Sequence, residues 1–137
     1  MSVGVAEVAL SALSLAGRWT LVLEDEYFIA DDIAKALIKA GAIVIGPFVT
    51  SADALDVVES GAALDLAVLD INLQGEVSFA VADALKTRGI PYVFATGYGM
   101  EMVPEAHRNV PHWEKPFDAD ALIRALGTLA GADPHAT

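Results

Sequence analysis

Five short apolar runs, separated by segments with helical patterns, constrain the fold of this chain most. Two of them, LAVLD at 66–70 and YVFAT at 92–96, run almost without polar residues instead of alternating. Such runs are typical of strands buried on both faces, as in a parallel sheet covered by helices on both sides. The candidate strands span 19–23, 42–48, 64–70, 92–96 and 110–114.

Helical patterns lie between these runs. After the first run, Ile29, Ile33 and Leu37 recur along one helix face, and Gly41 follows where a helix end favours a left-handed residue. This alternation predicts an α/β fold: a flavodoxin-like, doubly wound five-stranded parallel sheet of order 2-1-3-4-5 in a three-layer α/β/α arrangement. The predicted caps of the other helices are Ser51, Ser78 and Asp118.

The segment between the fourth and fifth strands departs from the alternation. It contains Gly97, Gly99, Pro104 and Pro111, and the only room for a helix lies at 100–107. A proline inside a helix removes a backbone donor and clashes with the preceding turn. The fourth helix is therefore predicted to be short or irregular.

The length, composition and net charge of the chain exclude several classes of protein. Its 137 residues fit one domain, and 55% hydrophobic residues can supply a core. The absence of cysteine excludes disulfides and thiolate metal sites. A net charge of −11 argues against binding to nucleic acid, which needs clustered lysine and arginine. We expect a domain at 18–131, an N-terminal extension at 1–17 and a tail at 132–137.

The apolar segment at 2–17 is too short to cross a membrane and lacks the basic residues that open a signal peptide. We therefore expect a cytoplasmic protein without membrane contact. Val5, Val8, Leu13 and Leu15 form a loose helical stripe, so a homodimer through this extension is a further prediction.

Polar side chains gather where the predicted strands end. In an open parallel sheet the carboxyl ends of the strands meet at one edge, where ligands bind. The residues at or just after these ends are Glu24, Asp25, Asp70, Thr96 and Lys115. Carboxylates this close repel each other unless a cation joins them, and an all-oxygen set suits Mg²⁺.

The same set suggests phosphoryl chemistry. A carboxylate beside Mg²⁺, here Asp70, can attack phosphorus and form an acyl phosphate. The remaining phosphoryl oxygens then need neutralisation, which the Lys115 ammonium, the Thr96 hydroxyl and the metal can supply.

With these residues in this order, and with Pro116 after the lysine, the sequence resembles the receiver domain of two-component response regulators over about residues 18 to 131. The resemblance implies that Asp70 accepts a phosphoryl group from a histidine kinase or histidine phosphotransfer protein. It also implies that Mg²⁺ is bound by Asp25, Asp70, the Asn72 backbone carbonyl and, through water, Glu24. It also implies that Lys115 pairs with the phosphoryl group, that Thr96 moves toward it, and that the Lys115–Pro116 bond is cis.

The end of the fourth predicted strand indicates one subgroup within this family. The run FATGY at 94–98 resembles the single-domain subgroup named for its FAT-G-aromatic motif, in which the region after this strand departs from the usual helix. Tyr98 and Asn72 are candidates for controlling access of water to the acyl phosphate. Where the family usually has an aromatic switch residue, three positions before Lys115, this chain has His112, followed by Trp113. The remaining histidines, His107 and His135, show no metal-ligand spacing and are expected to lie on the surface or in the core.

Three functions are open at this stage. The first is a single-domain phosphoacceptor that catalyses only its own phosphorylation and dephosphorylation and signals through a protein partner, since the sequence ends soon after the last predicted helix. The second is an Mg²⁺-dependent phosphohydrolase, although such an enzyme would usually carry a second acid where Asn72 stands. The third is a binding module that is never phosphorylated, against which the complete set of acids, Thr96 and Lys115 argues.

Overall fold

The computed structural model describes residues 14–73, 76–77, 79–97 and 103–130. Within these ranges, one sheet has five parallel strands in the order β2-β1-β3-β6-β7. The strands are β1 (Trp19–Leu23), β2 (Ile43–Phe48), β3 (Leu66–Leu69), β6 (Tyr92–Thr96) and β7 (His112–Glu114). Because β4 and β5 form a separate hairpin, this is the predicted order 2-1-3-4-5, and the predicted fold class is confirmed.

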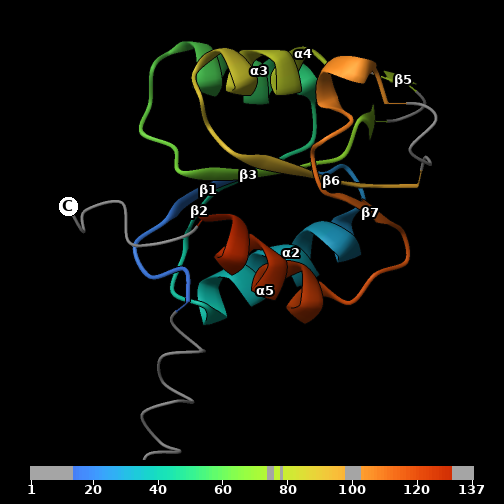
Figure 1. Cartoon of the computed structure of the whole chain (residues 1–137). Coiled ribbons are helices and arrows are strands. Elements are labelled where there is room, and N and C mark those ends of the chain that lie inside the picture. Colours follow the sequence, from blue (N-terminus) through green and yellow to red (C-terminus); the bar gives the residue numbers. More distant parts are fainter. Residues whose placement is uncertain (1–13, 74–75, 78, 98–102, 131–137) are drawn as a thin grey trace, which may run out of the picture.

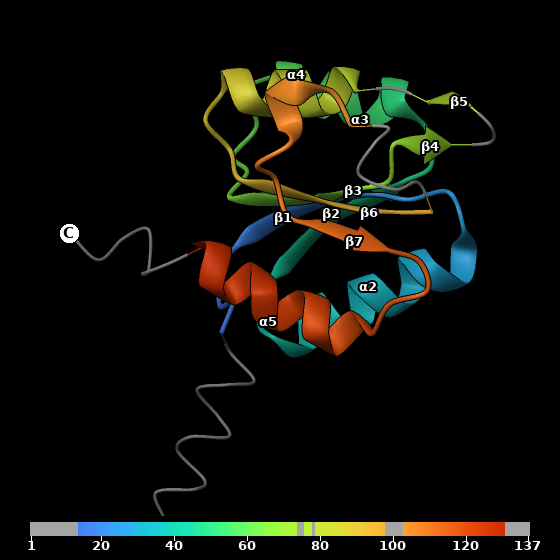
Figure 2. The ribbon, with the colours of Figure 1, turned by 45° about the vertical axis from the view of Figure 1, so that its right-hand side comes forward.

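Helices cover both faces of the sheet. Above it lie α3 (Ser51–Glu59) and α4 (Ala80–Thr87), and below it lie α2 (Tyr27–Lys39) and α5 (Ala119–Ala130) (Figure 1). Figure 2 shows the same three layers after a turn of the view. None of the helices in the described ranges is both long and apolar enough to traverse a bilayer.

The inner strands β1, β3 and β6 are mostly apolar because their side chains alternate between two hydrophobic clusters. In β1, Leu21 and Leu23 point into the cluster beneath α3 and α4, called the upper cluster here, whereas Val22 points into the lower cluster against α2 and α5. The lower cluster also contains Leu15, which is fully buried. The sheet is therefore the centre of the molecule, and only its edges meet solvent.

Of the five described glycines with a positive φ, two mark a helix end and an irregular step in the sheet. Gly41 ends α2 with φ of 92°, as its place in the sequence predicted. Gly46 has φ of 110° where the register between β1 and β2 shifts, and a Cβ there would lie 2.7 Å from the Phe48 nitrogen. The edge strand can make this irregular step only because residue 46 has no side chain.

The start of α3 differs from the prediction. Its N-cap is Thr50, whose hydroxyl accepts a hydrogen bond from the Asp53 N–H at 3.2 Å. Ser51 is the first helical residue, so its assignment as the cap was wrong.

The other two predicted caps had different outcomes. α4 begins at Ala80 with Phe79 in the cap position, and the predicted cap Ser78 lies outside the described residues. Asp118 is confirmed as the cap of α5, because its Oδ1 accepts a hydrogen bond from the Asp120 N–H.

The connections between strands show two further differences. The predicted short or irregular fourth helix is confirmed as η2 (Glu105–His107), a single 3-10 turn. The hairpin of β4 (Asn72–Leu73) and β5 (Glu76–Val77) was not predicted. It lies between β3 and α4, and it therefore begins at the same edge of the sheet as the predicted site.

Candidate functional site

The carboxyl edge of the sheet brings three acidic side chains together. Glu24 and Asp25 follow β1, and Asp70 follows β3. One carboxylate oxygen from each lies within 4.8 Å of the other two. Glu24 and Asp70 are only 1% and 3% exposed, so most of this negative charge is removed from water. The predicted convergence of these acids is therefore present in the structure.

A single lysine holds the acids together. The Lys115 Nζ lies 2.8 Å from Glu24 Oε1 and 2.8 Å from Asp70 Oδ2. It also lies 3.3 Å from Oε1 of Glu26, an exposed acid on the rim. The lysine side chain is 12% exposed, and its cis peptide bond to Pro116 agrees with the expectation from the resemblance. Lys115 therefore joins segments that are distant in the sequence.

Backbone groups fix the remaining carboxylate oxygens. Asp70 Oδ1 accepts a hydrogen bond from the Asn72 N–H at 2.9 Å, which leaves Oδ2 to Lys115. Similarly, Glu24 Oε2 accepts a hydrogen bond from the Glu26 N–H at 3.0 Å. The Asp70 backbone N–H donates to the carbonyl of Leu23 at the end of β1. These bonds set the direction of the Asp70 carboxylate before any ligand binds.

Burial and hydrogen bonding shift the pKa values of Glu24 and Lys115 in opposite directions. Burial raises the pKa of Glu24 to about 7, against the hydrogen bonds from Lys115 and the Glu26 N–H, which lower it. Burial alone would lower the pKa of Lys115, but its hydrogen bonds to Asp70 and Glu24 outweigh burial and raise that pKa. Lys115 is therefore a permanent cation in the site.

The side chains present fit Mg²⁺. Three carboxylates (Glu24, Asp25 and Asp70) against one ammonium (Lys115) leave an excess of two negative charges when all are ionised. The cluster offers oxygen ligands only, and the chain has no cysteine, which suits a hard divalent cation better than a soft one.

The other predicted site residues differ in where they lie. Thr96 ends β6 and is fully buried, and its carbonyl accepts a hydrogen bond from the Lys115 N–H at 3.0 Å. His112 lies on β7, half-buried, and its Nε2 is buried without a hydrogen-bond partner among the described residues. Trp113 packs against the lower cluster instead of facing the acids. Tyr98 lies outside the described residues.

Two features escaped the sequence analysis. Glu26 contacts the lysine, a contact for which the only signal was its place in a run of three acids. His107 is buried in the upper cluster and bonded through both ring nitrogens, which its sequence spacing did not indicate.

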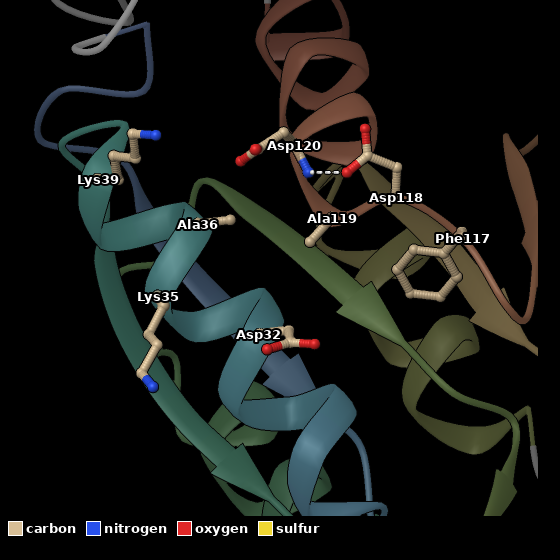
Figure 3. Close-up of a pocket in the computed structure, with 8 residues that line it drawn as sticks. All are labelled: Asp32, Lys35, Ala36, Lys39, Phe117, Asp118, Ala119 and Asp120. Carbon is tan, nitrogen blue, oxygen red and sulfur yellow. Dashed lines mark hydrogen bonds between the residues drawn. The ribbon is translucent and has the colours of Figure 1, made fainter.

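A separate hollow lies between α2 and the start of α5 (Figure 3). It has a volume of about 410 Å³ and is lined by both basic and acidic side chains: Lys35, Lys39, Asp32, Asp118 and Asp120. A smaller cavity of about 190 Å³ continues from it to Lys115 and Pro116. Among the described residues, the carboxylates that lie close enough together to share a metal ion are Glu24, Asp25 and Asp70, so the carboxylate edge is the site with the clearest chemistry.

No family model and no curated protein matches the sequence. Among solved structures, the BeF3-activated conformation of SdrG from Pseudomonas melonis is 40% identical, with a TM-score of 0.67, over 88% of this chain and 98% of SdrG. The N-terminal domain of a response regulator from Carboxydothermus hydrogenoformans is 29% identical, with a TM-score of 0.68, over 82% of this chain and 94% of that domain.

A third structure has a receiver fold with a metal. The receiver domain of the sensor histidine kinase PA1611 from Pseudomonas aeruginosa is 20% identical, with a TM-score of 0.67, over 85% of this chain and 100% of that domain. That structure has a magnesium ion coordinated in its active-site cleft. SdrG is 40% identical over 98% of its length, and the fold and the site of this chain agree with that relationship. The chain therefore belongs to the response regulator receiver domains.

Proposed function

We propose that this receiver accepts a phosphoryl group on Asp70 from the phosphohistidine of a histidine kinase or phosphotransfer protein. The proposed reaction depends on Mg²⁺, and its product signals through a protein partner. The observation that carries the proposal is the contact of one ammonium, Lys115 Nζ, with both Asp70 and Glu24 at 2.8 Å. It places a positive charge beside the carboxylate oxygen that would attack phosphorus.

Each site residue has a separate role in the proposed reaction. An Asp70 oxygen forms the new bond to phosphorus while the bond from phosphorus to the donor imidazole nitrogen breaks, and that nitrogen keeps the electron pair and gains a proton. Lys115 transfers its hydrogen bonds to a phosphoryl oxygen, and the Thr96 hydroxyl donates to another. Bound Mg²⁺ would neutralise phosphoryl charge. Its proposed ligands are Asp25, Asp70, the Asn72 carbonyl and, through water, Glu24.

The proposed protein is a signalling acceptor and not a turnover enzyme. It would catalyse only its own phosphorylation and dephosphorylation, because a phosphohydrolase of this kind would need a general acid near the nucleophile. The residue two positions after Asp70 is Asn72, which cannot supply a proton in that way. The run of Phe94 to Gly97 at the end of β6, together with the single turn η2, supports assignment to the FAT-G-aromatic subgroup.

Intact mass spectrometry tests this function. Incubation with acetyl phosphate and Mg²⁺ should add one phosphoryl group to the wild-type protein, and chelation of the metal should prevent the addition. The Asp70→Asn variant should gain none, whereas Asp56→Asn, a matched change on α3, should behave as wild type. An unmodified wild type, or an equal gain in Asp70→Asn, would contradict the proposal.

A further inference from the structure

A histidine lies among the apolar side chains of the upper cluster. His107 belongs to η2, in the segment 103–110 that connects β6 to β7, and its side chain is 1% exposed. Burying an imidazole is unfavourable unless both ring nitrogens find partners. The contacts of this ring therefore show which elements the segment is bonded to.

The two ring nitrogens bond to two different elements. Nε2 lies 2.7 Å from Oδ1 of Asp83 on α4, and Nδ1 contacts the hydroxyl of Tyr92 on β6. An ionised carboxylate only accepts hydrogen bonds, so Nε2 carries the proton, and the Tyr92 hydroxyl donates to Nδ1. In this arrangement both nitrogens of a neutral imidazole are satisfied.

Aromatic rings and a lysine reinforce the attachment. The His107 ring stacks on Phe79, at 5.9 Å and 11°, and meets Phe94 edge-on at 6.0 Å. Lys86 on α4 donates from Nζ to the carbonyl of Ala106 at 2.8 Å. Figures 1 and 2 both show this segment, in orange, beside α4 above the sheet. The segment is thus held against α4 and β6 together.

A rigid ring bonded at both ends is sensitive to the distance between its partners. The two nitrogens are fixed relative to each other, and hydrogen bonds weaken steeply once they are stretched or bent. His107 can keep both bonds only within a narrow range of placements of Tyr92 on β6 and of Asp83 on α4, whose side chain is 69% exposed. A shift of about 1 Å between these elements would break one of the bonds.

Strand β6 and helix α4 are both connected to the phosphoacceptor site along the chain. β6 carries Tyr92 and Phe94 and ends at Thr96, the residue proposed to move toward the phosphoryl group. On the other side, the chain runs from Asp70 through the β4–β5 hairpin to Phe79, the N-cap of α4, which stacks on the imidazole. Two separate segments of the chain therefore connect the site to the contacts of His107.

We propose that His107 is a latch that holds segment 103–110 closed on α4 and β6 while Asp70 is unmodified. Occupation of the Asp70 site shifts β6 through Thr96 and breaks the bonds of His107 to Tyr92 and to Asp83, which releases the segment. This inference rests on the proposed function. By linkage, a variant that lacks either bond should bind a phosphoryl analogue more tightly, because binding no longer has to break that bond.

Beryllofluoride with Mg²⁺, added to the full chain and followed by NMR, tests the latch. In the wild type, the imidazole signals of His107, assigned by their loss in His107→Gln, should shift as the site fills. Tyr92→Phe keeps the ring but removes its hydroxyl, and Asp83→Ala removes the other partner. Each variant should bind beryllofluoride about fivefold more tightly than wild type.

Two controls separate the latch from general loosening. Asp83→Asn retains an acceptor for Nε2 and should keep the wild-type affinity. Ile90→Val truncates a buried side chain of the same upper cluster without removing either partner of the ring nitrogens, and it should also leave the affinity unchanged.

The latch would be overturned if the His107 imidazole signals did not shift at saturating beryllofluoride. It would also be overturned if Tyr92→Phe and the wild type bound beryllofluoride with equal affinity. Either result would leave the proposed function intact. If beryllofluoride shifts no amide near Asp70 in the wild type, the proposed function fails, and the latch fails with it.

Discussion

At the scale of single residues, the site is a small set of buried charges held by one cation. Glu24 and Asp70 would repel each other without Lys115, which contacts both at 2.8 Å. Removing one member of a buried charged group leaves its partners uncompensated, which costs more than the pair itself contributes. The lysine therefore supports both the fold and the chemistry.

Replacing Lys115 by methionine should show this directly. Without Mg²⁺ at pH 8, above the pKa of about 7 of Glu24, the Lys115→Met variant should lose about 3 kcal/mol in free energy of unfolding, because two buried carboxylates lose their counter-charge. Added Mg²⁺ should restore part of the loss by replacing the missing positive charge. Urea denaturation with and without the metal measures both effects.

The matched control is a lysine on the surface. Lys35 pairs with Asp31 at 2.8 Å on α2, but its side chain is 74% exposed. Solvent screens such pairs, so Lys35→Met should leave the unfolding midpoint unchanged. Equal losses in the two variants would show that the buried position of Lys115 has no special importance.

At the scale of secondary-structure elements, the sequence was informative where a pattern is continuous. The runs that became β3 and β6 are almost entirely apolar, and parallel topology then requires their carboxyl ends to share one edge. This is why the convergence of Asp25, Asp70 and Lys115 was predictable although they are far apart in the chain.

Other elements carried no such pattern. The strands β4 and β5 have two residues each, too few to show a periodicity. The partners of His107 lie 15 and 24 residues away, so no local spacing indicates its bonds. The choice of cap between Thr50 and Ser51 depends on backbone angles, because both hydroxyls suit the role.

The corrected cap of α3 gives a test at this scale. Thr50→Ala should lower the free energy of unfolding by about 1 kcal/mol, because the Asp53 N–H loses its acceptor. Ser51→Ala, one position later inside the helix, should change it by less than about 0.5 kcal/mol. Thermal denaturation followed by circular dichroism compares the two variants. A larger loss in Ser51→Ala would reverse the assignment of the cap.

At the scale of the whole molecule, the sheet carries the site on one edge and separates two hydrophobic clusters. The acids come from the ends of β1 and β3, and the lysine follows β7, so the site exists only when the sheet is complete. A ligand that binds this edge must therefore bind the folded state alone, and it stabilises the entire domain by mass action.

Binding of Mg²⁺ should accordingly raise the melting temperature. At a free concentration about one hundred times Kd, the wild type should gain about 2.7 kcal/mol in free energy of unfolding. Asp25→Asn removes one carboxylate of the cluster and should gain clearly less, whereas the surface variant Asp31→Asn should gain as much as wild type. Equal gains in all three proteins would place the metal elsewhere.

The central claim is that the acidic edge prepares one side chain, Asp70, to form an acyl phosphate. Treatment of the phosphorylated protein with borohydride reduces an aspartyl phosphate to homoserine, and peptide sequencing by mass spectrometry then locates the modified position. We predict homoserine at position 70 alone, and only when Mg²⁺ was present during phosphorylation. Homoserine at another acid, or a phosphoryl group that resists reduction because it is bound to a hydroxyl or an imidazole, would contradict the account.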